Sequence, residues 1–203
     1  VMLDALEPAV ASSFERAIDR LRAAGFEVAA VDLPALSDAA SLQRGGGLSA
    51  AESWAWHRHR LAERQAQYDP RVALRIRRGE SMNAADYIDL LRERSEWIER
   101  MGAALAPYDA MLSPTVPIVA PPIAPLEASD DAFFATNALL LRNPSLVNLL
   151  DGCALSLPCH RDGDWPVGLM VWAPALCDDR VLSLSLAIGR ALAPLRHATR
   201  SGA

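Results

Sequence analysis

The residues of this chain that could do chemistry are few, and one kind is missing altogether. All 20 basic residues are arginine, so no lysine can act as a Schiff base, a general base or a phosphate-loop cation. His57 and His59 are two apart on a predicted helix, so they point to different faces and are poorly placed to share a metal ion. His160 falls in a predicted turn and His197 in the tail, which are positions typical of surface histidines. We therefore predict no metal site and no cofactor.

The nucleophilic side chains lack the neighbours that would activate them. A serine nucleophile needs an adjacent base and an oxyanion hole, yet Ser12 and Ser13 lie inside a predicted helix without glycine neighbours. Ser156 lies on a predicted buried strand, and no Gly-x-Ser-x-Gly elbow occurs in the sequence. The three cysteines match no zinc or redox spacing, which predicts reduced, buried thiols. No catalytic constellation follows from residue chemistry alone.

The bulk composition excludes several classes of protein. The chain has 203 residues, 51% hydrophobic and 22% charged, which is ordinary for a soluble globular domain. Its formal net charge of −5 argues against a nucleic-acid surface. No apolar run is long enough to cross a bilayer, and the N-terminus carries no secretory pattern. We expect one domain over residues 1–203, in the cytoplasm, with no nucleic-acid or membrane partner.

The first half of the chain is predicted to be mainly helical. Apolar residues recur at helical spacing over 8–24, after a proline suited to the first turn. Residues 26–33 alternate and are rich in valine and alanine, which predicts a strand. Further helices are predicted over 48–67, 70–78 and 83–106, the last two capped by Asp69 and Asn83.

The second half is predicted to supply the rest of a sheet. A short buried strand over 108–112 precedes residues 113–125, the Pro-rich loop, whose five prolines exclude helix and central strand. Because this loop is apolar, we expect it to be ordered and to lie along a core. The remaining predicted elements are helices over 130–141, 144–151 and 178–192, and strands over 154–159 and 166–172 that form a hairpin. A parallel crossover between the strands at 26–33 and 108–112, added to this hairpin, gives an α/β fold with a mixed β-sheet flanked by helices.

Several motifs follow one another in a recognisable order. They read YDAMLSPTVP at 108–117, APPI at 120–123, RNP at 142–144, NLLDGCALSLPC at 148–159 and PVGLMV at 166–171. Together with the helix and strand over 8–33, they make the chain similar to the C-terminal half of amidase-signature enzymes. Smaller departures from that pattern are Cys153, His160 and Met170, which replace a common Pro, Gly and Gln.

The resemblance implies hydrolysis of a carboxamide C–N bond by a Ser–cis-Ser–Lys triad, in which a neutral lysine is the base. Those groups belong to the family's N-terminal half, and this chain contains neither a lysine nor a Gly-Gly-Ser-Ser-Gly run. We therefore assign it no catalytic residue and expect the isolated 203-residue chain to be inactive. An apolar face should be exposed where the missing half would pack, so the chain should depend on that half or self-associate.

The role that the resemblance implies for this half is to form one side of the cleft for a small amide substrate. Thr115, Pro117, Arg142 and Asn143 flank element ends, where cleft loops lie, and are predicted to surround one concave surface. A purely structural interpretation pairs Arg142 with a carboxylate and has Asn143 cap a helix that begins at Pro144.

Two further functions remain open from the sequence. The resemblance also fits the glutaminase (A) subunit of a tRNA-dependent amidotransferase, which would work with other subunits. A non-catalytic remnant domain fits the absence of the triad. The coding sequence upstream of Val1 would separate these possibilities from an amidase.

Overall fold

A computed structural model of the chain describes residues 1–196 and shows two compact units. Unit 1 consists of Val1–Leu33 and the chain from Gly102 onward, and unit 2 is Pro34–Met101. The sequence predicted one domain over residues 1–203, and the structure shows two compact units within it. The extent of the domain stays a prediction. His197 lies outside the described residues.

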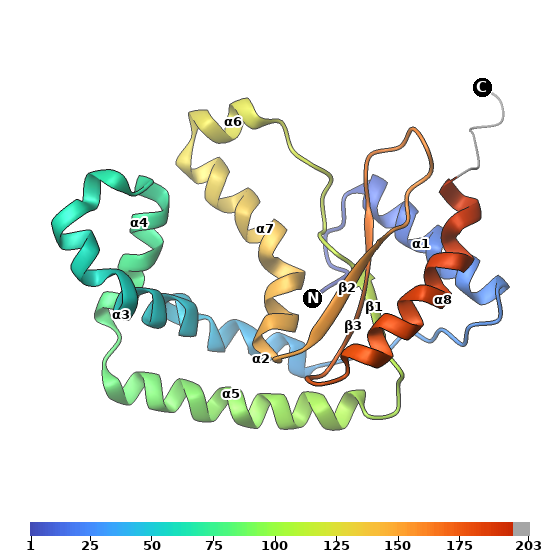
Figure 1. The fold of residues 1–203 in the computed structure, drawn as a ribbon, viewed down its shortest axis with the longest axis horizontal. Coiled ribbons are helices and arrows are strands. Elements are labelled where there is room, and N and C mark those ends of the chain that lie inside the picture. Colours follow the sequence, from blue (N-terminus) through green and yellow to red (C-terminus); the bar gives the residue numbers. More distant parts are fainter. Residues whose placement is uncertain (197–203) are drawn as a thin grey trace. The chain divides into compact units, whose positions relative to one another are not determined.

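Unit 1 is built on a three-stranded sheet in the order β1-β3-β2 (Figure 1). Its strands are β1 (Met111–Pro114), β2 (Cys153–Pro158) and β3 (Gly168–Ala173). β3 pairs antiparallel with both neighbours, so that Val171 faces Leu112 on one side and Leu155 on the other. The predicted hairpin and the α/β class are confirmed.

The predicted strand over 26–33 is wrong, and with it the expectation of a mixed sheet. These residues form no strand, and both pairings of the observed sheet are antiparallel. Phe26 and Val28 nevertheless pack against the hydrophobic core. A strand also requires a neighbouring backbone to bond with, and residues 27–33 find none within the described chain.

Two helices cover one face of the sheet. α1 (Pro8–Ala23) and α8 (Asp178–Arg196) contact each other, and they pack against β1 and against β2 and β3 respectively (Figure 1). Alternate strand residues point into this layer, because side chains on a strand alternate between faces. The core they share includes Val10, Ala17, Leu21, Leu169, Val171, Val181, Ile188 and Leu192.

The segment between β1 and β2 differs from the prediction in two ways. α7 (Asp130–Leu149) is a single helix that runs through Pro144, where two helices were expected. The proline removes only one intrahelical N–H donor, and the helix continues past it. The preceding α6 (Ile123–Ala128) begins inside the Pro-rich loop, because proline is tolerated in a first helical turn.

Unit 2 contains helices and turns, and the helices predicted over 48–67, 70–78 and 83–106 are present within about three residues of those bounds. The Asp69 carboxylate accepts from the backbone N–H groups of Arg71 and Val72 at 2.8 and 3.2 Å, which confirms the predicted N-cap. Asn83 and Asp86 cap each other's backbone N–H groups in the same way. Its helices are α2 (Ala35–Leu42), α3 (Gly47–Arg64), α4 (Pro70–Arg77) and α5 (Ala84–Leu105, which ends in unit 1), with short 3-10 turns at Arg44–Gly46, Gln65–Gln67 and Arg78–Ser81. Within the described chain, no helix combines the length and hydropathy needed to cross a membrane.

Candidate functional site

The start of the Pro-rich loop is fixed to the sheet by Thr115. Its backbone N–H donates to the carbonyl of Gly168 at 2.8 Å, which extends the β1–β3 pairing by one residue. Its hydroxyl Oγ1 lies 2.6 Å from the Oγ of Ser156, on the far side of β3. The two hydroxyls meet above Gly168, where a Cβ would lie only 2.6 Å from Thr115 Oγ1. A glycine is therefore required at 168 for this hydroxyl pair to form.

Asn143 holds the same loop from the opposite direction. Its side chain is completely buried, and its amide nitrogen donates to the carbonyls of Pro114 at 2.8 Å and Met2 at 3.0 Å. Its amide oxygen accepts from Arg142 Nε at 3.2 Å. Asn143 lies inside α7, so the capping role considered for it is wrong. It joins three segments that are distant in the sequence.

Glu7 provides the third attachment. Its backbone N–H donates to the Pro117 carbonyl at 2.9 Å, and its carboxylate accepts from the Val119 backbone N–H at 2.9 Å. Pro114 and Pro117 are both fully buried. The Pro-rich loop is thus ordered over residues 113–119 and lies along the core, as its apolar composition predicted.

The four predicted site residues occupy very different environments. The Pro114 carbonyl brings Asn143 next to Thr115, so residues far apart in the sequence do adjoin. Asn143 and Pro117 are buried, whereas Thr115 and Arg142 are partly exposed. Arg142 also donates to the Met2 carbonyl at 3.4 Å and makes no ion pair in the described chain. A substrate-binding role for these residues stays a prediction.

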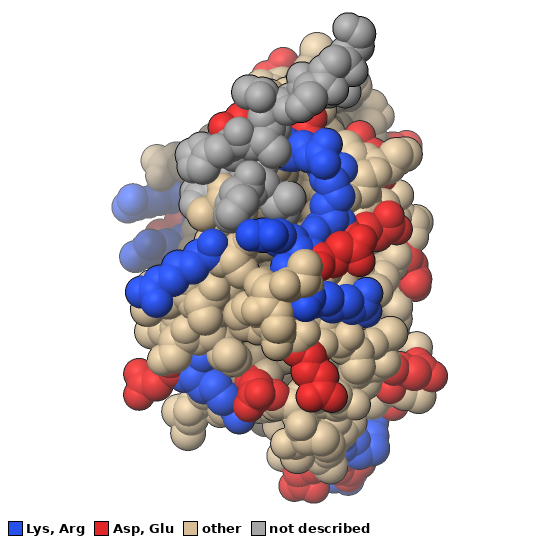
Figure 2. Space-filling view, turned by 90° about the vertical axis from the view of Figure 1, so that its right-hand side faces the viewer, with Lys and Arg blue, Asp and Glu red and all other residues tan. Residues whose placement is uncertain are grey.

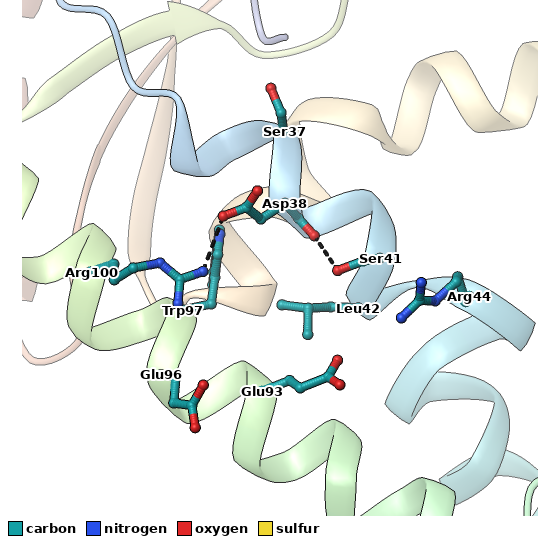
Figure 3. A pocket seen from close by; sticks show the side chains of 9 residues that line it. All are labelled: Ser37, Asp38, Ser41, Leu42, Arg44, Glu93, Glu96, Trp97 and Arg100. Atoms are coloured by element: carbon teal, nitrogen blue, oxygen red, sulfur yellow. Dashed lines mark hydrogen bonds and ion pairs between the residues drawn. The ribbon is translucent and has the colours of Figure 1, made fainter.

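Two hollows lie elsewhere and are lined by none of these four residues. The unit 1 groove, about 720 Å³, lies among α1, α8, residues 26–31 and residues 107–112. The unit 2 hollow, about 450 Å³, lies between α2 and α5. Figure 3 shows the Asp38–Arg100 ion pair, at 3.0 Å, along its rim, with Glu93 and Glu96 pointing from α5. Its opposed charges largely balance one another, so it presents no strong preference for an anion or a cation.

The remaining reactive groups have structural partners. His57 Nδ1 lies 2.9 Å from the Tyr68 hydroxyl, and the Val167 N–H donates to His160 Nδ1 at 3.2 Å, closing the hairpin connection. Burial raises the pKa of the Cys159 thiol to about 12, and desolvation also raises the pKa of Cys153. High thiol pKa values disfavour the nucleophilic thiolate. Among the described residues, no group of three histidine, cysteine or carboxylate side chains could hold a metal ion.

The face that Figure 2 shows carries charged side chains of both signs. Arginine side chains and carboxylates are interspersed there with uncharged atoms between them. The ion pairs of unit 1 include Arg16–Asp164 at 3.4 Å and Arg22–Asp19 at 3.7 Å. The site thus consists of a rigid, hydroxyl-bearing loop without a base beside its hydroxyls in the described chain.

Comparison with known proteins shows what kind of domain carries this loop. A family model described as Amidase matches residues 2–182. The chain belongs to the amidase family. It is 31% identical over 190 residues to 2-amino-5-chloromuconic acid deaminase of Comamonas testosteroni, covering 91% of this chain and 40% of that protein. It is 30% identical over 224 residues to the glutamyl-tRNA(Gln) amidotransferase (A) subunit of Mycolicibacterium paratuberculosis, covering 95% and 43%.

Solved structures confirm the amidase-family fold. Kluyveromyces lactis allophanate hydrolase superimposes with a TM-score of 0.81 at 23% identity, over 93% of this chain and 30% of that one. A structure described as an amidase gives a TM-score of 0.74 at 28% identity, over 96% and 44%. The chain thus spans about two-fifths of the length of the curated relatives that it matches.

The amidase-family motifs converge in unit 1. The run at 108–117 forms β1 and the anchored loop, the run at 148–159 forms the end of α7 and β2, and the run at 166–171 enters β3. The sequence did not identify Ser156 and Gly168 as partners of Thr115, although they lie in the motifs at 148–159 and 166–171. It also missed Glu7, for which the sequence offers no signal, because its carboxylate binds a loop residue 112 positions away.

Proposed function

We propose that this chain walls the substrate cleft of an amidase that hydrolyses a carboxamide C–N bond. The nucleophile and base come from a portion of the family domain outside the chain, by a Ser–cis-Ser–Lys mechanism. The observation that supports this most strongly is the family match over residues 2–182 on a chain that contains no lysine. The Pro-rich loop contributes a rigid wall, since its three attachments fix residues 113–119 before substrate arrives.

Thr115 and Arg142 are the wall residues that could touch a substrate. Both are partly exposed, and both carry donors suited to a carbonyl or carboxylate oxygen. Asn143 and Pro117 act by holding the loop, because neither is accessible. In the assembled enzyme, Thr115→Val should raise KM more than it lowers kcat if its hydroxyl binds substrate in ground and transition states alike.

The isolated chain is inactive under this proposal. Thr115 and Ser156 share one hydrogen bond, and neither has an imidazole or amine beside it in the described chain to remove its proton. The test is to assay the purified chain against simple carboxamides and to treat it with a serine-directed phosphonate. We expect no turnover and no stoichiometric label. One serine labelled per chain, together with turnover, would refute the proposal.

A second candidate is the glutaminase component of a tRNA-dependent amidotransferase. It is favoured by 30% identity to a glutamyl-tRNA(Gln) amidotransferase component over 95% of this chain. The two candidates differ in what the complete protein needs. An amidase turns over simple carboxamides alone, whereas a glutaminase component should hydrolyse glutamine efficiently only with its partner subunits. If neither activity appears when the whole reading frame is expressed, a non-catalytic remnant is the better description.

We also assign the protein to the cytoplasm. All three cysteines are free thiols, as is usual in a reducing compartment. Fractionation of the native cells with a cytoplasmic marker tests this assignment, and recovery of the protein with an extracytoplasmic marker would contradict it.

A further inference from the structure

Two of the three free thiols lie near one end of the β2–β3 hairpin. Cys153 is the first residue of β2 and pairs with Ala173, the last residue of β3. Its sulfur Sγ lies 3.5 Å from the carbonyl oxygen of Pro174, the next residue along the chain. Cys153 and Cys177 are both half-buried and pack against the same hydrophobic core.

A short connection brings Cys177 to the first thiol. It spans residues 174–176, and Leu176 has a positive φ of 62° there, immediately before Cys177 and the start of α8. Burial raises the pKa of the Cys153 thiol, and a hydrogen bond from the Cys177 backbone acts in the opposite direction. The Cys153 sulfur is therefore in contact with the residue that carries the second thiol. Arg180 Nη2 donates to the Cys177 sulfur at 2.9 Å, which holds that side chain at the beginning of α8.

The third thiol is too distant to join this pair in the folded chain. Cys159 directly follows β2, so the length of the strand, roughly 20 Å, separates it from Cys153. The Cα atoms of a disulfide lie within about 7 Å of each other. Among the three cysteines, all of which the structure describes, the fold therefore favours a bridge between Cys153 and Cys177 alone.

We infer that Cys153 and Cys177 form a reversible oxidation site, at which a low-molecular-weight disulfide converts the two thiols into one intramolecular disulfide. Cys177 reacts first, because burial raises the pKa of the Cys153 thiol and keeps its nucleophilic thiolate scarce. The Cys177 thiolate attacks one sulfur of the reagent, whose S–S bond breaks and releases one thiol. The Cys153 thiolate then attacks the Cys177 sulfur and releases the second thiol. The protein thereby gives up two protons and two electrons, which reduce the reagent to two thiols.

The bridge joins the start of β2 to the start of α8. These two elements already contact each other, so rotation of the two side chains is the main change that the bond requires. The bond also closes a loop over residues 153–177, which restricts the unfolded chain and should make oxidised unit 1 more resistant to unfolding. The inference goes beyond the proposed function and does not depend on it, because it uses only side chains of unit 1.

Oxidation with glutathione disulfide tests the assignment. The purified 203-residue chain is incubated with the reagent under native conditions and then digested without reduction for mass spectrometry. The intact chain should lose the mass of two hydrogen atoms, and one pair of peptides should be linked through Cys153 and Cys177. Dithiothreitol should reverse both changes. Cys159→Ala is the matched control and should be oxidised as the parent is, because Cys159 takes no part.

Unfolding in urea separates proximity in the fold from proximity in the sequence. Shorter loops close more readily in a flexible chain, so the unfolded chain should favour the Cys153–Cys159 bridge. The folded chain should instead favour the Cys153–Cys177 bridge by at least about tenfold. Cys153→Ser should accumulate a mixed disulfide between glutathione and Cys177, because the thiol that completes the exchange is missing.

Three results would overturn the inference. They are no loss of mass in the folded chain, a native bridge that involves Cys159 or a second copy of the chain, and the same distribution of bridges with and without urea. If Cys153→Ser fails to fold, the comparison of the folded and unfolded parent chain still decides the question, because it needs no variant.

Discussion

Asn143→Ala should destabilise unit 1 far more than its size suggests. The substitution removes two hydrogen bonds, to the carbonyls of Pro114 and Met2, from a side chain that is fully buried. Two such bonds contribute about 2 kcal/mol net, and the Pro114 carbonyl, left without its donor, adds further cost. We therefore expect the free energy of unfolding to fall by about 2–4 kcal/mol.

The measurement must report on unit 1 alone, because the chain has two compact units. Urea-dependent amide exchange of β3 meets this need, since β3 is the central strand of that unit. Asn148→Ala is the matched control, because Asn148 lies on the same helix but is exposed, and it should change stability by less than about 0.5 kcal/mol. Equal effects of the two substitutions would refute the assignment of Asn143 as the loop's anchor.

Three other changes test separate parts of the structure. Gly168→Ala places a Cβ against the Thr115–Ser156 hydroxyl pair and should lower the free energy of unfolding in urea by about 1–3 kcal/mol. Adding Thr115→Ala and Ser156→Ala should restore part of that stability, and no recovery would mean that the crowding lies elsewhere. Burial raises the pKa of Cys159 to about 12, so the stability that the thiol contributes is full below pH 9 and falls as the pH rises toward 12. The free energy of unfolding should therefore drop by about 1 kcal/mol between pH 8 and 10, and Cys159→Val should remove that drop. Asp69→Ala should cost about 1 kcal/mol by uncapping α4, seen as faster amide exchange in that helix, with Asp69→Asn nearly neutral.

The elements that the sequence predicted well are those determined by local chemistry. The hairpin of β2 and β3 follows from two apolar runs joined by a polar turn, and its strands were placed within two residues. The N-caps at Asp69 and Asn83 could also be predicted from the sequence, because a capping side chain bonds to backbone only two or three residues away. In each case, the interacting groups are neighbours in the sequence.

The predictions that failed depend on distant partners. Asn143 before a proline has the local pattern of a helix cap, but its bonding partners are 29 and 141 residues away. Residues 26–33 have the composition of a strand, yet a strand is completed by hydrogen bonds that the described chain does not provide. Apolar periodicity decides which face is buried, and it does not decide which backbone lies alongside.

The attachments of the Pro-rich loop link its shape to the folding of unit 1. Glu7 is the residue before α1, Asn143 belongs to α7 and Gly168 begins β3, so the loop is held only when three separate elements are in place. Substitutions at Glu7 or Asn143 should therefore change stability and substrate binding together. Thr115→Ser keeps a hydroxyl and the backbone bond to Gly168, so it should preserve both stability and binding. Thr115→Val keeps the side-chain volume and the backbone bond but removes the hydroxyl. A rise in KM larger than its loss of stability explains would therefore report a direct contact between the hydroxyl and the substrate. Identical KM values for the two variants would mean that the loop shapes the cleft wall without touching the substrate through Thr115.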